Sequence, residues 1–215
     1  MVSRDQAAPL IAIIDLDMGN LHSVANAVSQ CGFDAKVVSA SEDLDAASHL
    51  VIPGVGSFVT AMERMRRLEL VEPIRRFAET GRPVLGICLG MQLLGSKGTE
   101  GGECEGLGLV PGTVVRLDEH LVPAIPHVGW NDVRVVRLHP VLERVKSGVD
   151  FYFVHSYHLL PDHPEHLVGV AQYGEIEVAA IVATENVVGF QFHPEKSQSN
   201  GLKLLESFCE WNPRC

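Results

Sequence analysis

Four short apolar segments near the start of the chain constrain its fold more than any other feature of the sequence. Each spans only a few residues and ends at a polar residue, a glycine or a proline; they occupy residues 10–14, 36–39, 49–53 and 83–88. Apolar runs of this length are typical of strands whose two faces are both buried in a parallel sheet. The sequence therefore predicts a parallel sheet covered by other elements on both faces.

Amphipathic segments separate these predicted strands. Residues 21–31, 59–68 and 71–80 carry apolar side chains at helical spacing, and Gly32 and Gly81 follow the first and the third segment. Glycine is a frequent helix terminator because it adopts a left-handed backbone conformation without strain. The alternation of strands and helices predicts an α/β fold, namely a flavodoxin-like, doubly wound, mostly parallel sheet flanked by helices.

The second half of the chain has a different pattern. Residues 98–112 are rich in Gly and Glu and are expected to form a long surface loop. Strand-like segments joined by short turns follow, at residues 113–117, 132–136, 151–159, 168–172, 178–184 and 187–193. Because strands joined directly by turns pair antiparallel, we expect a small antiparallel extension, closed by an amphipathic helix over residues 200–211. No linker divides the sequence, so residues 1–215 are predicted to form a single domain, with residues 1–9 as a polar N-terminal extension.

Composition argues against several classes of protein. A net charge of −10 and a pI near 5.4 disfavour a binder of nucleic acids or anionic membranes. The five cysteines are odd in number and include no C-x-x-C pair, which disfavours a disulfide framework or a zinc site. Neither a signal peptide nor an apolar run of about 18 residues is visible. We therefore expect a cytoplasmic protein with free thiols.

The sequence Gly86-Ile87-Cys88-Leu89-Gly90 lies between a predicted strand and a predicted helix. A G-x-C-x-G motif at this turn is the cysteine counterpart of the nucleophile elbow. The sharp turn puts its central residue in a strained conformation, and the flanking glycines avoid side-chain clashes. The thiol would lie at the carboxyl end of the sheet and at a helix N-terminus, which favours the thiolate. The alternative is that Cys88 is only a small buried side chain.

The sequence His193-Pro194-Glu195 closes the last strand-like segment. Residues two positions apart on an extended chain lie on one side of it, about 6.6 Å apart, so the carboxylate can reach the imidazole. Glu195 would then orient His193 and stabilise the imidazolium that forms when His193 takes the proton of Cys88. These residues predict a catalytic triad that requires no metal or organic cofactor. The alternative is a proline turn with a solvated carboxylate and an unused histidine.

A loop that contains two glycines, Pro53-Gly54-Val55-Gly56-Ser57, follows the third predicted strand. Attack on an amide carbonyl creates an oxyanion, which needs backbone N–H donors directed at it. The backbone at Val55 and Gly56 is a candidate for one donor of this oxyanion hole, and the amide of Leu89 is the natural second donor. On its own, a P-G-x-G sequence indicates only a turn.

Three motifs together resemble those of the class I glutamine amidotransferases: P-G-V-G, G-I-C-L-G-M-Q and F-H-P-E-K-S, in this order. Residues 17–21, 127–131 and 153–157 make the chain most similar to one branch of this family, the glutaminase subunits that act with a cyclase in histidine biosynthesis. The resemblance extends from about residue 10 to residue 211. It implies that the chain hydrolyses glutamine to glutamate and ammonia through a thioester on Cys88.

The resemblance also implies contacts with substrate and partner. The residues that would bind glutamine are Gly56, Leu89, Gln92, Glu100 and the backbone around His155, Ser156 and Tyr157. Trp130, Asn131 and Lys196 would face the partner, a cyclase subunit built as a (β/α)₈ barrel, in a heterodimer. Ammonia would pass through that barrel without meeting bulk water.

The sequence departs from the family pattern at Gly95-Ser96-Lys97-Gly98, where an aromatic and an acidic residue are usual. This departure affects the expected helix end and the placement of Glu100. Two other functions stay open: a glutaminase subunit of another class I amidotransferase, such as that of pyridoxal phosphate synthase, or a flavodoxin-like sensor in which Cys88 is oxidised. Release of glutamate from glutamine would separate the amidases from the sensor, and copurification with a barrel cyclase would separate the two amidases.

Overall fold

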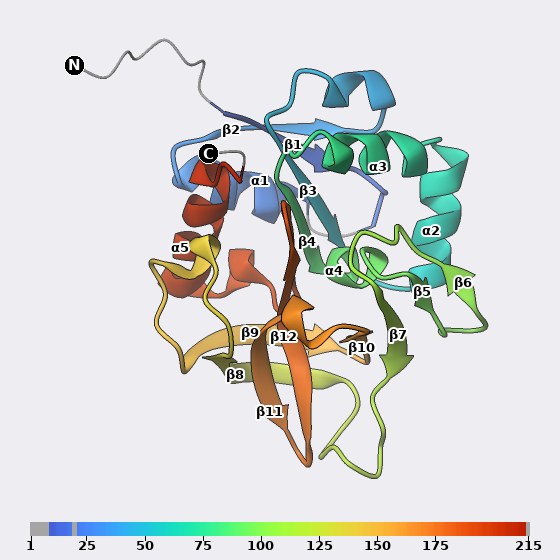
Figure 1. The fold of residues 1–215 in the computed structure, drawn as a ribbon, viewed down its shortest axis with the longest axis vertical. Helices are drawn as coiled ribbons and strands as arrows, with labels where there is room; N and C mark the ends of the chain where they lie inside the picture. The colour runs from blue at the N-terminus through green and yellow to red at the C-terminus, as the bar shows by residue number, and fades with distance from the viewer. Residues whose placement is uncertain (1–8, 19–20, 214–215) are drawn as a thin grey trace.

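A computed structural model describes residues 9–18 and 21–213 of the chain. The expectations for residues 1–8, for Gly19-Asn20 and for Cys215 lie outside these residues. Helices and strands form a layered α/β structure, with parallel strands in the upper part of Figure 1 and antiparallel strands in the lower part.

The main sheet has nine strands in the order β2-β1-β3-β4-β13-β12-β11-β8-β9. Its first five strands are parallel and follow the strand order of flavodoxin-like folds, which confirms the predicted fold class. The bounds of these five are β1 Leu10–Ile14, β2 Asp34–Val38, β3 His49–Gly54, β4 Val84–Cys88 and β13 Val187–Phe190.

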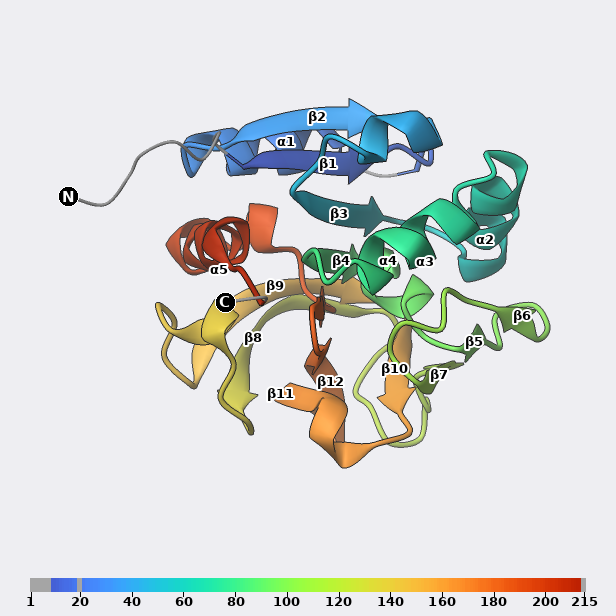
Figure 2. The same cartoon turned by 45° about the horizontal axis from the view of Figure 1, so that its top comes forward.

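Helices cover both faces of the parallel strands (Figures 1 and 2). One face carries α1 Leu21–Gln30 and α5 Gln198–Glu210, and the other carries α2 Phe58–Arg67, α3 Val71–Glu79 and α4 Leu89–Leu93. Consecutive side chains of β4 alternate between the two cores: Val84 packs in the core beneath α2 and α3, and Leu85 packs in the core beneath α1 and α5. This burial on both sides explains why the strands are uninterrupted apolar runs.

Antiparallel strands continue the main sheet beyond β13. They are β8 His127–Val135, β9 Val149–His155, β11 Leu167–Tyr173 and β12 Ile176–Thr184. A second sheet has the order β10-β7-β5-β6, with β5 Lys97–Gly98, β6 Cys104–Glu105, β7 Gly112–Arg116 and β10 Tyr157–Pro161. The predicted antiparallel extension is therefore confirmed in the main sheet, and the second sheet beside it is mixed, because β5 pairs parallel with β7. Short 3₁₀ helices occupy Ser41–Leu44, Pro140–Leu142, Pro164–His166 and Pro194–Lys196.

The predicted strand over residues 151–159 is wrong in one respect, because the chain forms two strands that belong to different sheets. The break is at Ser156, between β9 in the main sheet and β10 in the second sheet. The Ser156 carbonyl accepts a hydrogen bond of 2.9 Å from the amide of Leu117, next to β7. Apolar side chains continue on both sides of the break, so periodicity gives no sign of it.

The predicted loop over residues 98–112 also contains regular structure. It includes the end of β5 and all of β6, which pair antiparallel. The amide of Leu107 donates to the Leu93 carbonyl at 2.8 Å, which ties this segment to the end of α4. The last strand, β13, ends at Phe190, before His193, and β8 begins at His127 rather than at residue 132. No helix within residues 9–18 and 21–213 is long and apolar enough to span a bilayer.

Candidate active site

Cys88 stands at the turn from β4 to α4 in a strained conformation. Its φ is 54° and its ψ is −110°, in the region that favours glycine. A Cβ atom on Gly86 would lie 2.6 Å from the Gly90 carbonyl oxygen, and one on Gly90 would overlap the Ile52 carbonyl oxygen of β3. The elbow therefore requires both glycines for the reason that the sequence analysis gave, and it fixes the position of the sulfur.

The Cys88 sulfur lies in a nearly closed environment, since only 5% of the residue is exposed. Its Sγ is 3.7 Å from the Val154 carbonyl oxygen of β9. The Gln191 side-chain amide, wholly buried just after β13, donates to Sγ at 3.9 Å. Elements from both halves of the main sheet therefore surround the Cys88 sulfur.

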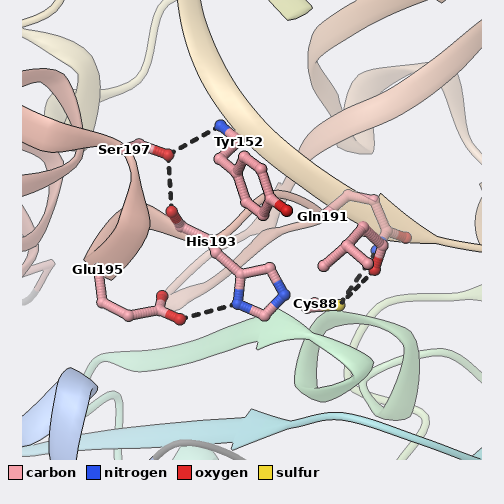
Figure 3. A network of polar contacts seen from close by, with 7 residues as sticks. Cys88, Tyr152, Gln191, His193, Glu195 and Ser197 are labelled. Atoms are coloured by element: carbon pink, nitrogen blue, oxygen red, sulfur yellow. Dashed lines mark hydrogen bonds and ion pairs between the residues drawn. The ribbon is translucent and has the colours of Figure 1, made fainter. Parts of the chain in front are cut away.

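His193 and Glu195 form a buried pair, with His193 Nδ1 and Glu195 Oε1 2.8 Å apart (Figure 3). Their geometry differs from the predicted extended strand, because Glu195 lies in the 3₁₀ turn Pro194–Lys196 and His193 is the residue before it. The Ser197 hydroxyl donates to the His193 carbonyl at 2.6 Å and accepts from the Tyr152 amide at 3.0 Å. This hydroxyl ties the turn to β9 and so holds the imidazole in place.

The second ring nitrogen of His193, Nε2, is turned toward Cys88 in Figure 3. It is buried and has no hydrogen-bond partner among the residues that the structure describes. Burial alone would lower the pKa of this imidazole, but its interactions with Cys88 and Glu195 outweigh burial and raise the pKa to about 9. His193 therefore carries a proton at neutral pH and can donate it to a leaving group.

A pocket of about 490 Å³ opens beside Cys88. The residues expected to form the oxyanion hole and those that the resemblance assigned to glutamine all line this pocket: Val55, Gly56, Leu89, Gln92, Glu100, His155, Ser156 and Tyr157. Ser57, Pro126 and Val154 complete the wall together with Cys88. A larger depression of about 980 Å³ lies near the start of β13 and contains no member of the triad.

Two polar side chains are held at the wall of this pocket. Glu100 Oε2 accepts a hydrogen bond of 2.7 Å from the backbone amide of Phe58, at the N-terminus of α2. Gln92 Nε2 donates to the Tyr157 carbonyl at 2.8 Å. The unusual sequence after α4 therefore leaves Glu100 beside the pocket, although it shortens the helix to Leu89–Leu93.

The loop after β3 contributes Val55, which is 42% exposed, and Gly56, whose φ is 99°. The positive φ explains why a glycine is needed there. Leu89 is the first residue of α4, so its amide is not used by the hydrogen-bond pattern of the helix. These backbone groups lie on the same pocket as the sulfur, as an oxyanion hole requires.

The predicted partner-facing residues fall into two groups. Trp130 is 49% exposed and its ring meets Tyr152 edge-on at a centroid distance of 6.0 Å. The Lys196 ammonium lies 6.0 Å from the centroid of the same tyrosine, so these three residues share one surface. Asn131 differs, because its side-chain amide bonds to His127 and to the Gln172 carbonyl.

Several residues of the site escaped the sequence analysis. Gln191 contacts the sulfur, Ser197 anchors the triad, and His127 lies behind the pocket wall. Gln191 and Ser197 flank the predicted His193 and Glu195 within one motif, so their position along the chain was the only available signal. Among the described residues, no group of three or more His, Cys, Asp or Glu side chains is arranged to hold a metal ion.

A sequence model of the family "Glutamine amidotransferase class-I" matches residues 12–210. Two similar relatives are both called imidazole glycerol phosphate synthase subunit HisH. The protein of Moorella thermoacetica is 45% identical over 200 residues, which cover 93% of this chain and 94% of the relative. That of Aquifex aeolicus is 48% identical over 199 residues, which cover 91% and 94%.

A solved structure described as PurLQS from Thermotoga maritima superimposes with a TM-score of 0.76 and covers 95% of this chain and 99% of that chain. The sequence identity of 20% means that this likeness concerns the fold alone. The family match and the relatives agree with the motifs around Cys88 and His193. The chain therefore belongs to the class I glutamine amidotransferase family, among the HisH subunits of imidazole glycerol phosphate synthase.

Proposed function

We propose that this chain hydrolyses glutamine to glutamate and ammonia and supplies the ammonia to a cyclase subunit that makes imidazole glycerol phosphate in histidine biosynthesis. One observation supports this most directly: a strained elbow cysteine lines a pocket and interacts with a histidine that forms a buried pair with a carboxylate. The names of the relatives supply the reaction to which the ammonia contributes. We propose that the chain acts as a single domain, which the sheet that continues from β2 to β9 supports. We place it in the cytoplasm, where thiols such as those of Cys31, Cys88, Cys104 and Cys209 stay reduced.

The reaction begins with attack of the Cys88 thiolate on the side-chain amide carbon of glutamine. The His193 imidazolium beside it stabilises the thiolate before attack, and the Glu195 carboxylate stabilises the imidazolium. Negative charge then develops on the amide oxygen, and the backbone N–H groups near Val55, Gly56 and Leu89 donate hydrogen bonds to it as an oxyanion hole. Negative charge thus moves from the sulfur to an oxygen that is stabilised by hydrogen bonds from backbone N–H groups.

Collapse of the tetrahedral intermediate breaks the carbon–nitrogen bond. His193 donates its proton to the departing nitrogen, which leaves as ammonia, and a γ-glutamyl thioester remains on Cys88. His193, now neutral, removes a proton from water as the water attacks the thioester. Glutamate leaves, and the thiolate–imidazolium pair is restored.

The glutamine itself would be bound by the residues that line the pocket. Glu100 is suited to an ammonium group, because it is the carboxylate among the lining residues. Gln92 and the backbone of His155, Ser156 and Tyr157 offer uncharged donors and acceptors for the amide and the carboxylate. Glutamine would then be recognised both by its charged amino-acid end and by its side-chain amide.

The partner surface is proposed around Trp130, Tyr152 and Lys196. The half-exposed Trp130 and the exposed Lys196 both lie next to Tyr152. Aromatic and long cationic side chains of this kind often contribute most of the binding energy at protein interfaces. Val154 of neighbouring β9 lines the pocket, so a barrel cyclase docked here would lie close to the site where ammonia forms. Such a heterodimer would carry ammonia through the barrel.

A direct test measures glutamate released from glutamine, with and without the cyclase subunit. We expect release that increases when the cyclase and its nucleotide substrate are present. A glutamine-like chloromethyl ketone should also alkylate Cys88 in preference to the other cysteines. Absence of glutamate release from the assembled complex would contradict the proposal, and labelling of another cysteine would contradict the role of Cys88.

A further inference from the structure

Four hydrogen bonds form a chain behind the pocket wall, on strands β8 and β9. Asn131 Nδ2 donates to the Gln172 carbonyl of β11 at 2.9 Å and lies 3.2 Å from His127 Nε2. His127 Nδ1 is 2.9 Å from His155 Nε2, and His155 Nδ1 is 2.9 Å from the Tyr157 carbonyl oxygen. This chain leads from the exposed side of the sheet to the substrate pocket.

The two ends of the chain fix the direction of every bond. Both ends are backbone carbonyls, which only accept, so Asn131 and His155 must donate to them. If both imidazoles are neutral, His155 Nε2 accepts from His127 Nδ1–H, and His127 Nε2 accepts from Asn131. Four N–H groups then make four bonds. One extra proton would leave two N–H groups pointing at each other.

The surroundings of the two histidines favour the neutral form. His127 and His155 are 3% and 5% exposed, and the His127 ring stacks on Phe153 and Tyr173 at centroid distances of 4.7 and 3.8 Å. No carboxylate of the described residues bonds to either ring. Burial lowers the pKa of His127 to about 4 and that of His155 to about 3, the latter with contributions from nearby His127, His158 and His193.

A second set of bonds continues from the same Tyr157 carbonyl to the nucleophile. Gln92 Nε2 donates to this carbonyl at 2.8 Å and to Gln191 Oε1 at 3.2 Å. Because its amide nitrogen serves these two acceptors, the Gln92 oxygen is turned away from them, and Gln92 lines the pocket. Gln191 accepts with its oxygen, so its nitrogen is the atom that faces Cys88 Sγ, at 3.9 Å.

We propose that His127 is a positioning residue of the glutamine pocket: by donating to His155 Nε2 it stabilises the Nδ1–H tautomer of His155, which holds the Tyr157 carbonyl. That carbonyl sets which ends of the Gln92 and Gln191 amides face the substrate and the sulfur. The idea rests on the proposed glutaminase function. An oxygen of Gln92 facing the pocket accepts from N–H groups, which glutamine carries on its amide and its ammonium. His127 acts only through His155, since it does not line the pocket.

The first test replaces His127 by phenylalanine in the assembled complex with the cyclase. His127→Phe keeps an aromatic ring between Phe153 and Tyr173 but removes both of its hydrogen bonds. We expect KM for glutamine to rise about five- to a hundredfold, the effect of an unsatisfied hydrogen-bonding group, with a smaller change in kcat. Tyr173→Leu is the matched control, because it removes the ring stacked on His127 and leaves all four bonds. It should lower stability without the rise in KM.

A second measurement requires no activity, and its wild-type part does not depend on folding of the variant. Nitrogen-15 NMR of the histidines in the wild-type chain should show His127 and His155 neutral, with the proton on Nδ1, at pH 7 and still at pH 5.5. In His127→Phe the Nδ1–H form of His155 should lose its dominance. A charged His155, or a proton on Nε2 in the wild type, would overturn the proposal, and so would an unchanged KM in a folded variant. If the wild-type complex releases no glutamate, the proposed function fails, and the NMR result still decides the tautomer.

Discussion

Two buried histidine sites near the same pocket have pKa values that are shifted in opposite directions. His193 is paired with Glu195 and faces Cys88, and its pKa is raised to about 9. His127 and His155 are buried to a similar extent and form hydrogen bonds to uncharged partners, and burial lowers their pKa values to about 4 and about 3. The comparison teaches that burial does not decide the charge of a histidine here. The charge depends instead on whether an anion lies within hydrogen-bonding distance of the ring.

Removing the sulfur that faces His193 should have the largest effect on glutamine hydrolysis. Cys88→Ala takes away one of the two groups that raise the pKa of His193, and it removes the nucleophile. Glutamine hydrolysis should fall by about a thousandfold or more, the scale seen when a nucleophile is deleted. Glutamate release measured beside thermal unfolding checks this, because the variant should stay folded.

Two controls complete this experiment. Cys104→Ala alters another thiol outside the pocket and should leave hydrolysis unchanged. Synthesis by the complex from added ammonium should survive in Cys88→Ala. Equal loss of the glutamine- and ammonium-dependent reactions would mean that Cys88 serves assembly rather than chemistry.

Glu195→Gln should make the surroundings of His193 resemble those of His127 and His155, which have no carboxylate partner. The amide keeps the size of the carboxylate but removes its charge, so the pKa of His193 should fall. We expect kcat for glutamine hydrolysis to decrease by about a hundred- to ten-thousandfold, as when the orienting carboxylate of a triad is replaced. The pH dependence of kcat measures both effects. Glu206→Gln, at an exposed ion pair with Arg144, is the control and should have a normal profile.

Trp130→Ala probes whether the strands that carry the neutral histidines also bind the partner. Trp130 shares β8 with His127, and its ring is half-exposed beside Tyr152. Loss of an interface anchor should weaken cyclase binding by about thirtyfold, measured by titration calorimetry. Leu138→Ala removes a 91%-exposed apolar side chain away from this surface and should not change affinity. Equal affinities of both variants would place the interface elsewhere.

The smallest effects should appear in the pH dependence of stability, with opposite signs at the two sites. His193 binds its proton more tightly when folded, so its contribution is complete below pH 6.5 and is lost as pH rises through about 9. His127 and His155 bind protons more weakly when folded, so stability is lost as pH falls below 6.5 toward about 4 and about 3.

Denaturant unfolding from pH 4 to pH 10 measures both contributions. Glu195→Gln should flatten the alkaline decline and His127→Phe part of the acid decline, each on the order of 1 kcal/mol. The acid effect is partial because burial also lowers the pKa values of His139 and His158 to about 4. If Glu195→Gln flattened the acid decline in stability, the assignment of the acid decline to His127 and His155 and of the alkaline decline to His193 would be contradicted.

The sequence was most informative where function depends on neighbours in the chain. The elbow around Cys88 could be predicted because a sharp turn needs glycines at fixed offsets, and the His193–Glu195 pair because its members are two residues apart. The pair forms through a 3₁₀ turn instead of an extended strand. Either backbone puts the two side chains within reach, so the contact was predicted although its geometry was not.

Contacts between distant parts of the chain could not be predicted in this way. His127 and His155 meet because β8 pairs with β9 in a register that puts these two residues opposite each other. Gln92 and Gln191 lie 99 positions apart and bond only because β4 and β13 are neighbours. Each of these residues has an ordinary environment in the sequence. Only strand pairing gives them a common role.

The break at Ser156 means that two different sheets meet at the wall of the pocket. Cys88, His193 and Glu195 are attached to the nine-stranded sheet, whereas the chain passes into the four-stranded sheet between His155 and Tyr157. A small rotation of one sheet against the other would change the width of the pocket at this seam. It would leave the spacing between sulfur and imidazole almost unaltered. The sulfur and the imidazole are therefore held by one sheet, whereas the wall of the pocket is shared between the two sheets.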